Sequence, residues 1–233
     1  MTRVIEQAIE EWENYTCLNF SRANPDTVAK IVFFYGEGCS SDVGYRGYEG
    51  TTQYVEINFF CLEKSTVIHE IGHAIGWIHE HARPDRDDYV RVNYDKIPEM
   101  YHSQFDTFDE ELINDYGVQY DYRSIMHFGG DEPVPGSMET LDPMYQDIIG
   151  KAEGLSYRDT KLANLMYDCA GKSKAGGCQS DCSRYGDAFQ DKNCVCMCPG
   201  DGTRPVPCEE GVHTPTTPES ATARTDATTK VFP

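Results

Sequence analysis

The stretch HEIGHAIGWIHEH, residues 69–81, contains four of the seven histidines in a chain of 233 residues. If it is helical, His69 and His73 lie one turn apart on the same face, because four residues turn an α-helix by about 400°. In an uninterrupted helix His79 would lie about 15 Å along the axis from His69, out of reach. Gly76 removes this difficulty, since glycine readily takes the left-handed conformation that ends a helix and reverses the chain. We therefore predict that the three imidazoles converge on one point.

Three converging imidazoles suit Zn²⁺ and leave its fourth tetrahedral position open, which is typical of catalytic rather than structural zinc sites. A helical histidine pair alone is more often structural or solvent-exposed, so the prediction depends on His79 completing the set. Glu70 is displaced from His69 by about 100° around the helix, so its carboxylate can lean over the open position without binding the ion. There it can take a proton from a zinc-acidified water that attacks a carbonyl and pass it to the leaving amine. The sequence predicts one zinc per chain, with His69, His73 and His79 as ligands and Glu70 as general base.

The residues before this stretch predict one helix and two strands. Apolar residues at three- and four-residue steps predict an amphipathic helix over 2–15. Runs of β-branched and aromatic residues predict strands at 30–36 and 54–61. Ser65 is the expected N-cap of the helix that carries the histidines.

The residues after the stretch give weaker signals until the last helix. A helix is predicted over 96–106, and the Gly- and Pro-rich segment 128–154 is predicted to be irregular. Ser156 and Asp159 are spaced as a capping box for a final helix. Its inward-facing residues are predicted to be Leu162, Leu165 and Met166.

Composition limits the environment and the partners. The net charge of −19 argues against nucleic acid and acidic membrane surfaces as partners, because both would be repelled. Ten cysteines, six of them within 178–208, indicate disulfides and an oxidising compartment. The sequons at Asn14 and Asn19 agree with a secreted glycoprotein. Yet the sequence shows no signal peptide and no apolar stretch long enough to span a membrane, so we expect a chain that is truncated at its start.

Longer motifs identify a family resemblance. H-E-x-x-H-x-x-G-x-x-H followed by SIMHF, which contains Met126, is the metzincin pattern. More narrowly, HEIGHAIGWIHEHARPDRDDYV, TCLNF, YDYRSIMH and GLSYRDTKLANLMYDC resemble the astacin family over about residues 1–169. The resemblance implies a secreted zinc endopeptidase of the α+β class, with a two-lobed zincin fold, a mixed sheet and an active-site helix. Met126 would form an apolar floor below the zinc ligands. The implied disulfides are Cys17–Cys169 and Cys39–Cys61.

Three departures from the family pattern bear on activity. Phe128 replaces a tyrosine whose hydroxyl helps to hold the oxyanion, and losing one such donor typically lowers turnover by about 10²–10³. Tyr120 and Tyr122 are near in sequence but are not assigned to the metal. The propeptide and the amino-terminal segment that in the family packs near the glutamate corresponding to Glu80 are expected to be missing. The loop after Phe128 does not follow the family pattern, so the residues that form the wall of the substrate pocket are not defined. These include any basic residue that would select acidic side chains.

These departures support an alternative function, a catalytically weak or inactive relative that binds extracellular proteins. Domains are expected at 1–170 (astacin-like), 171–208 (cysteine-rich) and 209–233 (a disordered Thr/Pro/Ser-rich tail). The six cysteines of the module allow fifteen sets of three disulfides, and a zinc knuckle is the less favoured alternative because no C-x-x-C pair occurs. Protein or peptide substrates are the expected partners. The module is a candidate for substrate docking, for contact with extracellular protein or matrix, or for stabilisation.

Overall fold

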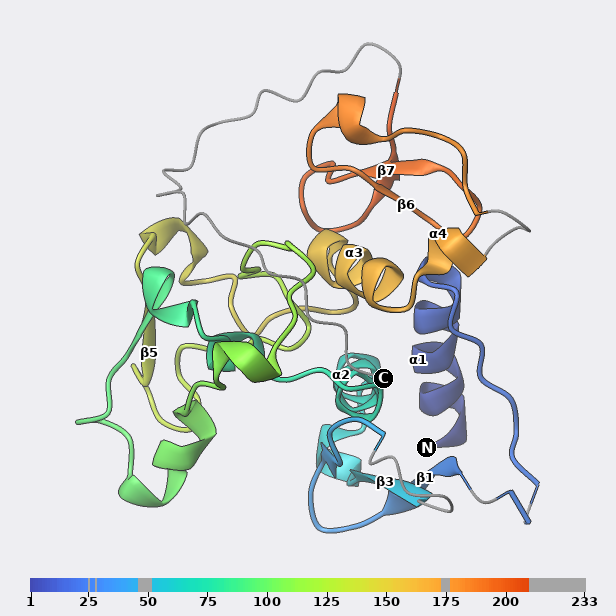
Figure 1. Ribbon diagram of the computed structural model, residues 1–233. Helices are drawn as coiled ribbons and strands as arrows, with labels where there is room; N and C mark the ends of the chain where they lie inside the picture. Colours follow the sequence, from blue (N-terminus) through green and yellow to red (C-terminus); the bar gives the residue numbers. More distant parts are fainter. Residues whose placement is uncertain (25, 28, 46–51, 173–176, 210–233) are drawn as a thin grey trace.

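The structure is a computed structural model that describes residues 1–209 except 25, 28, 46–51 and 173–176. The predicted disordered tail therefore lies outside the described residues, apart from residue 209. Figure 1 shows a central helix, α2, with α1 beside it and a small sheet below it in the view. A second lobe of mostly irregular chain lies on the other side of α2, and the cysteine-rich module lies next to α3 and α1.

The predicted first helix is confirmed as α1, Thr2–Tyr15. Its apolar face buries Ala8 and Trp12 completely against α2, Lys64–Ala74. The Trp12 indole Nε1 donates a hydrogen bond to the Ile68 carbonyl of α2 at 3.2 Å, and its ring meets the Trp77 ring edge-on at a centroid distance of 5.1 Å. The two helices are thus joined by both a polar and an aromatic contact.

The first sheet is mixed, as expected. It contains β1 (Lys30–Tyr35), β2 (Ser40–Ser41) and β3 (Thr52–Ile57) in the order β1-β3-β2, with β1 and β3 parallel and β2 antiparallel to β3. The prediction that the second strand reaches residue 61 is wrong. β3 ends at Ile57 because the Asn58 side chain accepts the Phe60 N–H and starts a 3-10 turn, Phe59–Cys61.

The second lobe has little regular structure. Its strands β4 (Val90–Val92) and β5 (Met138–Thr140) pair antiparallel over a small separate core. The helix predicted over 96–106 is a 3-10 helix, Glu99–Phe105. The segment 128–154 is irregular as predicted, except for β5 and the 3-10 turn Pro143–Tyr145. The other 3-10 turns of the described residues are Glu80–Ala82, Arg86–Asp88, Glu110–Leu112, Pro143–Tyr145 and, in the cysteine-rich module, Ser183–Tyr185.

The last helices are α3, Tyr157–Met166, and α4, Cys169–Lys172. The capping box of Ser156 and Asp159 at the start of α3 is confirmed. The prediction that Leu165 points inward is wrong, because its side chain faces solvent and is 38% exposed. The N-cap prediction for α2 is also wrong: the helix begins one residue before Ser65, after Glu63.

All ten cysteines lie in disulfides. The implied pairs Cys17–Cys169 and Cys39–Cys61 are confirmed. The module contains 178–194, 182–196 and 198–208, so the zinc-knuckle alternative is wrong because the module has no free thiolate to bind a metal. Its strands are β6 (Phe189–Gln190), β7 (Cys196–Cys198) and β8 (Val206–Pro207), in that order across an antiparallel sheet.

The module is docked onto the helices rather than set apart from them. The Arg204 guanidinium pairs with the buried Glu11 carboxylate of α1 and donates to the Leu155 carbonyl at 2.6 Å. Lys161 of α3 pairs with Asp187 of the module. The domain boundary at residue 170 stays a prediction. In the described part of the chain, no helix is both long enough and apolar enough to cross a membrane.

Candidate metal centre and active site

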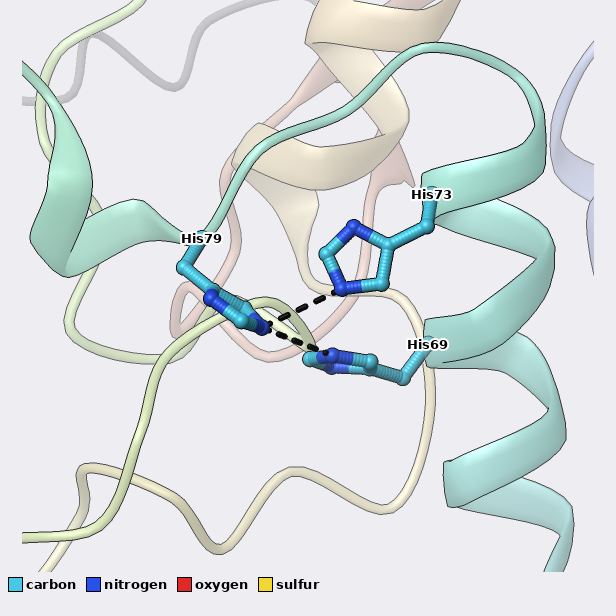
Figure 2. Close-up of side chains that lie close together, drawn as sticks. All are labelled: His69, His73 and His79. Carbon is cyan, nitrogen blue, oxygen red and sulfur yellow. Dashed lines mark hydrogen bonds between the residues drawn. The ribbon is translucent and has the colours of Figure 1, made fainter. Parts of the chain in front are cut away.

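Helix α2 ends where the sequence requires it to end. Gly76 has a φ of +110°, a conformation that side-chain-bearing residues rarely adopt, and its N–H donates to the His73 carbonyl at 2.9 Å. The Trp77 N–H also turns back, to the Gly72 carbonyl at 2.9 Å. The chain then runs back towards the helix and brings His79 opposite the two helical histidines, as Figure 2 shows.

The structure brings the three predicted ligand histidines together. The Nε2 atom of His79 lies 3.2 Å from Nε2 of His69 and 3.1 Å from Nε2 of His73 (Figure 2). All three candidate ligand atoms lie within 4.8 Å of one another. Tetrahedral zinc with Zn–N bonds of about 2.0–2.1 Å needs N···N separations of about 3.3 Å. The observed spacing therefore fits one zinc ion.

Main-chain carbonyls set the tautomers of the two helical histidines. Nδ1 of His69 lies 2.8 Å from the Ile125 carbonyl, and Nδ1 of His73 lies 2.8 Å from the Trp77 carbonyl. A carbonyl oxygen only accepts, so each Nδ1 carries the proton and each Nε2 keeps a free lone pair for a metal. Burial lowers the pKa of His69 to about 4 and also lowers the pKa values of His73 and His79. Neutral rings with free Nε2 atoms are the form that binds zinc.

Glu70 lies beside the histidines with a carboxylate that is buried but not fully bonded. The residue is 5% exposed, and its Oε2 atom has no hydrogen-bond partner among the described residues. Burial raises the pKa of Glu70 to about 7. A buried polar atom without a partner is costly, so this atom is expected to meet a water or a substrate group. Glu70 and His69 both border a cavity of about 270 Å³.

Met126 fills the space beneath the histidine-bearing helix. It is 1% exposed, and a Cβ built on Gly72 would lie only 2.7 Å from its Sδ atom. Its carbonyl accepts the Glu80 N–H at 2.9 Å, which ties the Met126 turn to the segment that follows His79. The expected apolar floor is therefore present, and it needs a glycine in the helix above it.

Sequence reasoning missed how this turn is held. It assigned Asp159 only to the capping box, yet Oδ1 of Asp159 accepts the Ser124 hydroxyl at 2.7 Å and Oδ2 accepts the Ile125 N–H at 2.8 Å. The Ile125 carbonyl then holds His69. Burial raises the pKa of Asp159 to about 6. The capping-box spacing was the only available signal, and it did not indicate a second role.

Among the described residues, neither Tyr120 nor Tyr122 supplies a hydroxyl to the three predicted ligand histidines. The Phe128 ring lies 4.4 Å from the His79 ring, measured between centroids. The Tyr120 hydroxyl is bonded to Nε2 of His127 at 2.7 Å, and the Tyr122 hydroxyl donates to the Tyr89 carbonyl at 2.9 Å. Both hydroxyls are thus engaged away from the three histidines.

Glu80 is buried in the second lobe next to a cavity of about 230 Å³. Its Oε1 atom accepts the Asp121 N–H at 2.7 Å and pairs with Arg83 at 3.3 Å. Burial raises the pKa of Glu80 to about 8. The Glu80 carboxylate is therefore held by the Asp121 N–H and the Arg83 guanidinium.

Comparison with known proteins gives a consistent result. The profile of the peptidase family described as Astacin matches residues 1–168. Blastula protease 10 of Paracentrotus lividus is 35% identical over 97% of this chain and 38% of its own length. Zinc metalloproteinase nas-36 of Haemonchus contortus is 38% identical over 88% of this chain and 33% of its own. The chain thus spans about a third of the length of these relatives.

Solved structures also match. The high choriolytic enzyme 1 of Oryzias latipes, a hatching enzyme zinc-protease, superposes with a TM-score of 0.65 at 31% identity, over 72% of this chain and 82% of that one. Myroilysin, at 22% identity and a TM-score of 0.52 over 71% of this chain and 85% of that one, shares the fold. Zinc is the metal of the family, and the three-histidine donor set fits it. The chain belongs to the astacin family of peptidases.

Proposed function

We propose that this protein is a secreted zinc-dependent endopeptidase in which His69, His73 and His79 bind the metal and Glu70 is the general base. The observation that carries the proposal is the convergence of three Nε2 atoms beside a buried carboxylate oxygen that has no partner in the described chain. A binding protein would have no use for an unsatisfied base at that position.

The proposed chemistry follows from the donor set and from Glu70. His69, His73 and His79 would hold the zinc, which when bound would supply an acidified water and polarise a substrate carbonyl. Glu70 accepts the proton of the attacking water on its carboxylate and delivers it to the nitrogen of the leaving amine. The Ile125 and Trp77 carbonyls keep the protons of His69 and His73 on Nδ1 throughout.

Secretion and glycosylation belong to the same proposal. Five disulfides are typical of an oxidising compartment and rare in the cytosol, which supports secretion. The side chains of Asn14 and Asn19 are both exposed, and Asn19 lies in the loop after α1, where an acceptor is accessible. The cysteine-rich module, docked on α1 and α3, is proposed to contact extracellular protein with its outer face.

Phe128 supports a second candidate, a catalytically weak or inactive protein-binding relative. Its ring lies against His79 where a hydroxyl could have faced an oxyanion, and neither neighbouring tyrosine compensates. Loss of one donor lowers turnover by about 10²–10³ but does not abolish it. We therefore expect slow cleavage rather than none.

The test uses the zinc-loaded chain with casein and a quenched peptide library. We expect one zinc per molecule and slow, chelator-sensitive cleavage within peptides that Glu70→Ala abolishes. Glu153→Ala, which removes an exposed carboxylate elsewhere, should have no effect. Phe128→Tyr should raise turnover. Cleavage that survives Glu70→Ala would contradict the assignment of the base, and zinc binding without any turnover would favour the second candidate.

A further inference from the structure

The cavity beside Glu70 has a charged wall. Its volume is about 270 Å³, and it lies between the start of α2 and the segment that follows the Met126 turn. Ser65 and Thr66 contribute hydroxyls from α2, and Phe128 and Ala152 contribute apolar surface from the opposite side. Apart from Glu70, the carboxylate among the described lining residues is that of Glu132, and no lysine or arginine lines the cavity.

Glu132 is held in place by the turn that it ends. Its Oε2 atom accepts the Gly129 N–H at 3.1 Å, and its own N–H donates to the Gly129 carbonyl at 3.4 Å. Gly150 presses against the same turn, since a Cβ there would lie 2.3 Å from the Gly129 backbone. The Glu132 carboxylate forms no ion pair within the described chain, so its charge is available to a substrate.

The shape and charge of the cavity favour one type of side chain. A lysine or arginine could lay its methylene stem on Phe128 and Ala152 and bring its charged end to Glu132. A charge-assisted hydrogen bond to a carboxylate is about twice as strong as a neutral one. An acidic side chain would instead face two carboxylates, Glu132 and Glu70, in a protein of net charge −19.

We propose that this cavity binds the substrate side chain next to the cleaved bond, and that Glu132 makes it selective for lysine or arginine. The proposal rests on the proposed endopeptidase function, because His69 and Glu70 border the same cavity. The wall of the substrate pocket that the sequence left undefined would then carry the acidic Glu132. A basic residue at that place would favour acidic substrate side chains instead.

The experiment compares peptides that differ in one residue. A randomised peptide library is cut by the zinc-loaded full chain, and mass spectrometry reads the residues on both sides of each cut. Matched quenched peptides with Lys, Gln or Glu at the selected position then give kcat/KM. We expect the Lys peptide to exceed the Glu peptide by about tenfold or more, and the ratio to fall with added salt. Glu132→Gln should reduce the ratio to about threefold or less, and Glu132→Lys should invert it.

A matched control separates the local carboxylate from the general field. Glu153→Gln removes the same charge from an exposed position outside the cavity and should preserve the ratio. Equal cleavage of the Lys and Glu peptides by the unaltered chain, an unchanged ratio in Glu132→Gln, or an equal loss in Glu153→Gln would each overturn the proposal.

A binding measurement keeps the proposal testable if turnover is too slow to measure. Fluorescence anisotropy with zinc-loaded Glu70→Ala and the same labelled peptides gives the ratio of dissociation constants. The Lys peptide should bind about tenfold more tightly than the Glu peptide, and adding Glu132→Gln should remove the difference. Equal dissociation constants for the Lys and Glu peptides would overturn the selectivity. Selective binding together with no cleavage by the unaltered chain would overturn only the endopeptidase function.

Discussion

The contact between Gly72 and Met126 predicts an energetic coupling between the metal-bearing helix and the turn below it. The perturbation is Gly72→Ala, made alone and together with Met126→Ala. The new Cβ would lie 2.7 Å from the Met126 Sδ atom, whereas ordinary van der Waals contact begins at 3.4 Å. The helix and the turn must therefore separate by about 0.7 Å, or Met126 must leave its position in a core where it is 1% exposed.

Two opposing effects set the size of the coupling. Alanine is favoured over glycine within a helix by about 1 kcal/mol. Overpacking a well-filled core costs about 1–3 kcal/mol. In the native background these two effects oppose each other, whereas in the Met126→Ala background only the helix propensity remains. Gly72→Ala should therefore stabilise Met126→Ala by about 1 kcal/mol and should be neutral or destabilising in the native chain, with a coupling of about 1–3 kcal/mol.

Guanidinium unfolding followed by tryptophan fluorescence measures the coupling, because Trp12 and Trp77 are buried in contact across α1 and the end of α2. Zinc affinity, determined by competition with a chelator, should also fall in Gly72→Ala, since the same separation stretches the bond between His69 and the Ile125 carbonyl. If the two substitutions are additive within about 0.5 kcal/mol, the close contact has no energetic meaning and the reasoning fails.

Three further outcomes test other parts of the structure. Replacing Cys17 and Cys169 by alanine should lower the free energy of unfolding by about 5 kcal/mol, and replacing Cys39 and Cys61 should lower it by about 3 kcal/mol. The first bridge should contribute more because it closes a loop of 152 residues, whereas the second closes a loop of 22. An equal loss for the two bridges in denaturant titrations would contradict the loop-closure explanation. With free zinc at about 1,000 times its Kd, removing the metal should lower the free energy of unfolding by about 4 kcal/mol and the Tm by about 10 °C in calorimetry. An unchanged Tm would argue against a metal that binds the folded state. Arg204→Ala should lower the free energy of unfolding by about 1–3 kcal/mol, since it removes one of the two cationic partners of the almost fully buried Glu11 carboxylate, whereas Arg204→Lys should lower it less; a neutral Arg204→Ala would mean that this ion pair does not stabilise the contact between the module and α1.

Local patterns predicted the parts of the site that local geometry determines. One short segment contains the three ligand histidines, His69, His73 and His79, together with Gly76. The structure has the convergence and the positive φ of Gly76 that this segment predicts. Capping at Ser156 was equally local. The implied bridges at Cys17 and Cys39 came from the family resemblance, because spacing alone cannot pair cysteines.

The failures arose where distant residues decide the local structure. The apolar run after Ile57 looks like a continued strand, but the Asn58 side chain and the bridge to Cys61 bend the chain away. Asp159 holds a turn 34 residues earlier in the sequence, which no helical pattern can reveal. Glu132 lies in a segment without periodicity, so its place in the wall of the cavity follows only from the folded backbone.

The orientation of the two helical imidazoles does not depend on any polar side chain. Their Nδ1 partners are peptide oxygens, at positions 125 and 77, and every amino acid carries that oxygen. The side chains at these two positions are buried in the core, so they act on the imidazoles only through packing and the path of the backbone. The tautomers of these two ligands thus depend on the path of the chain at positions 125 and 77, and not on a hydrogen-bonding side chain there.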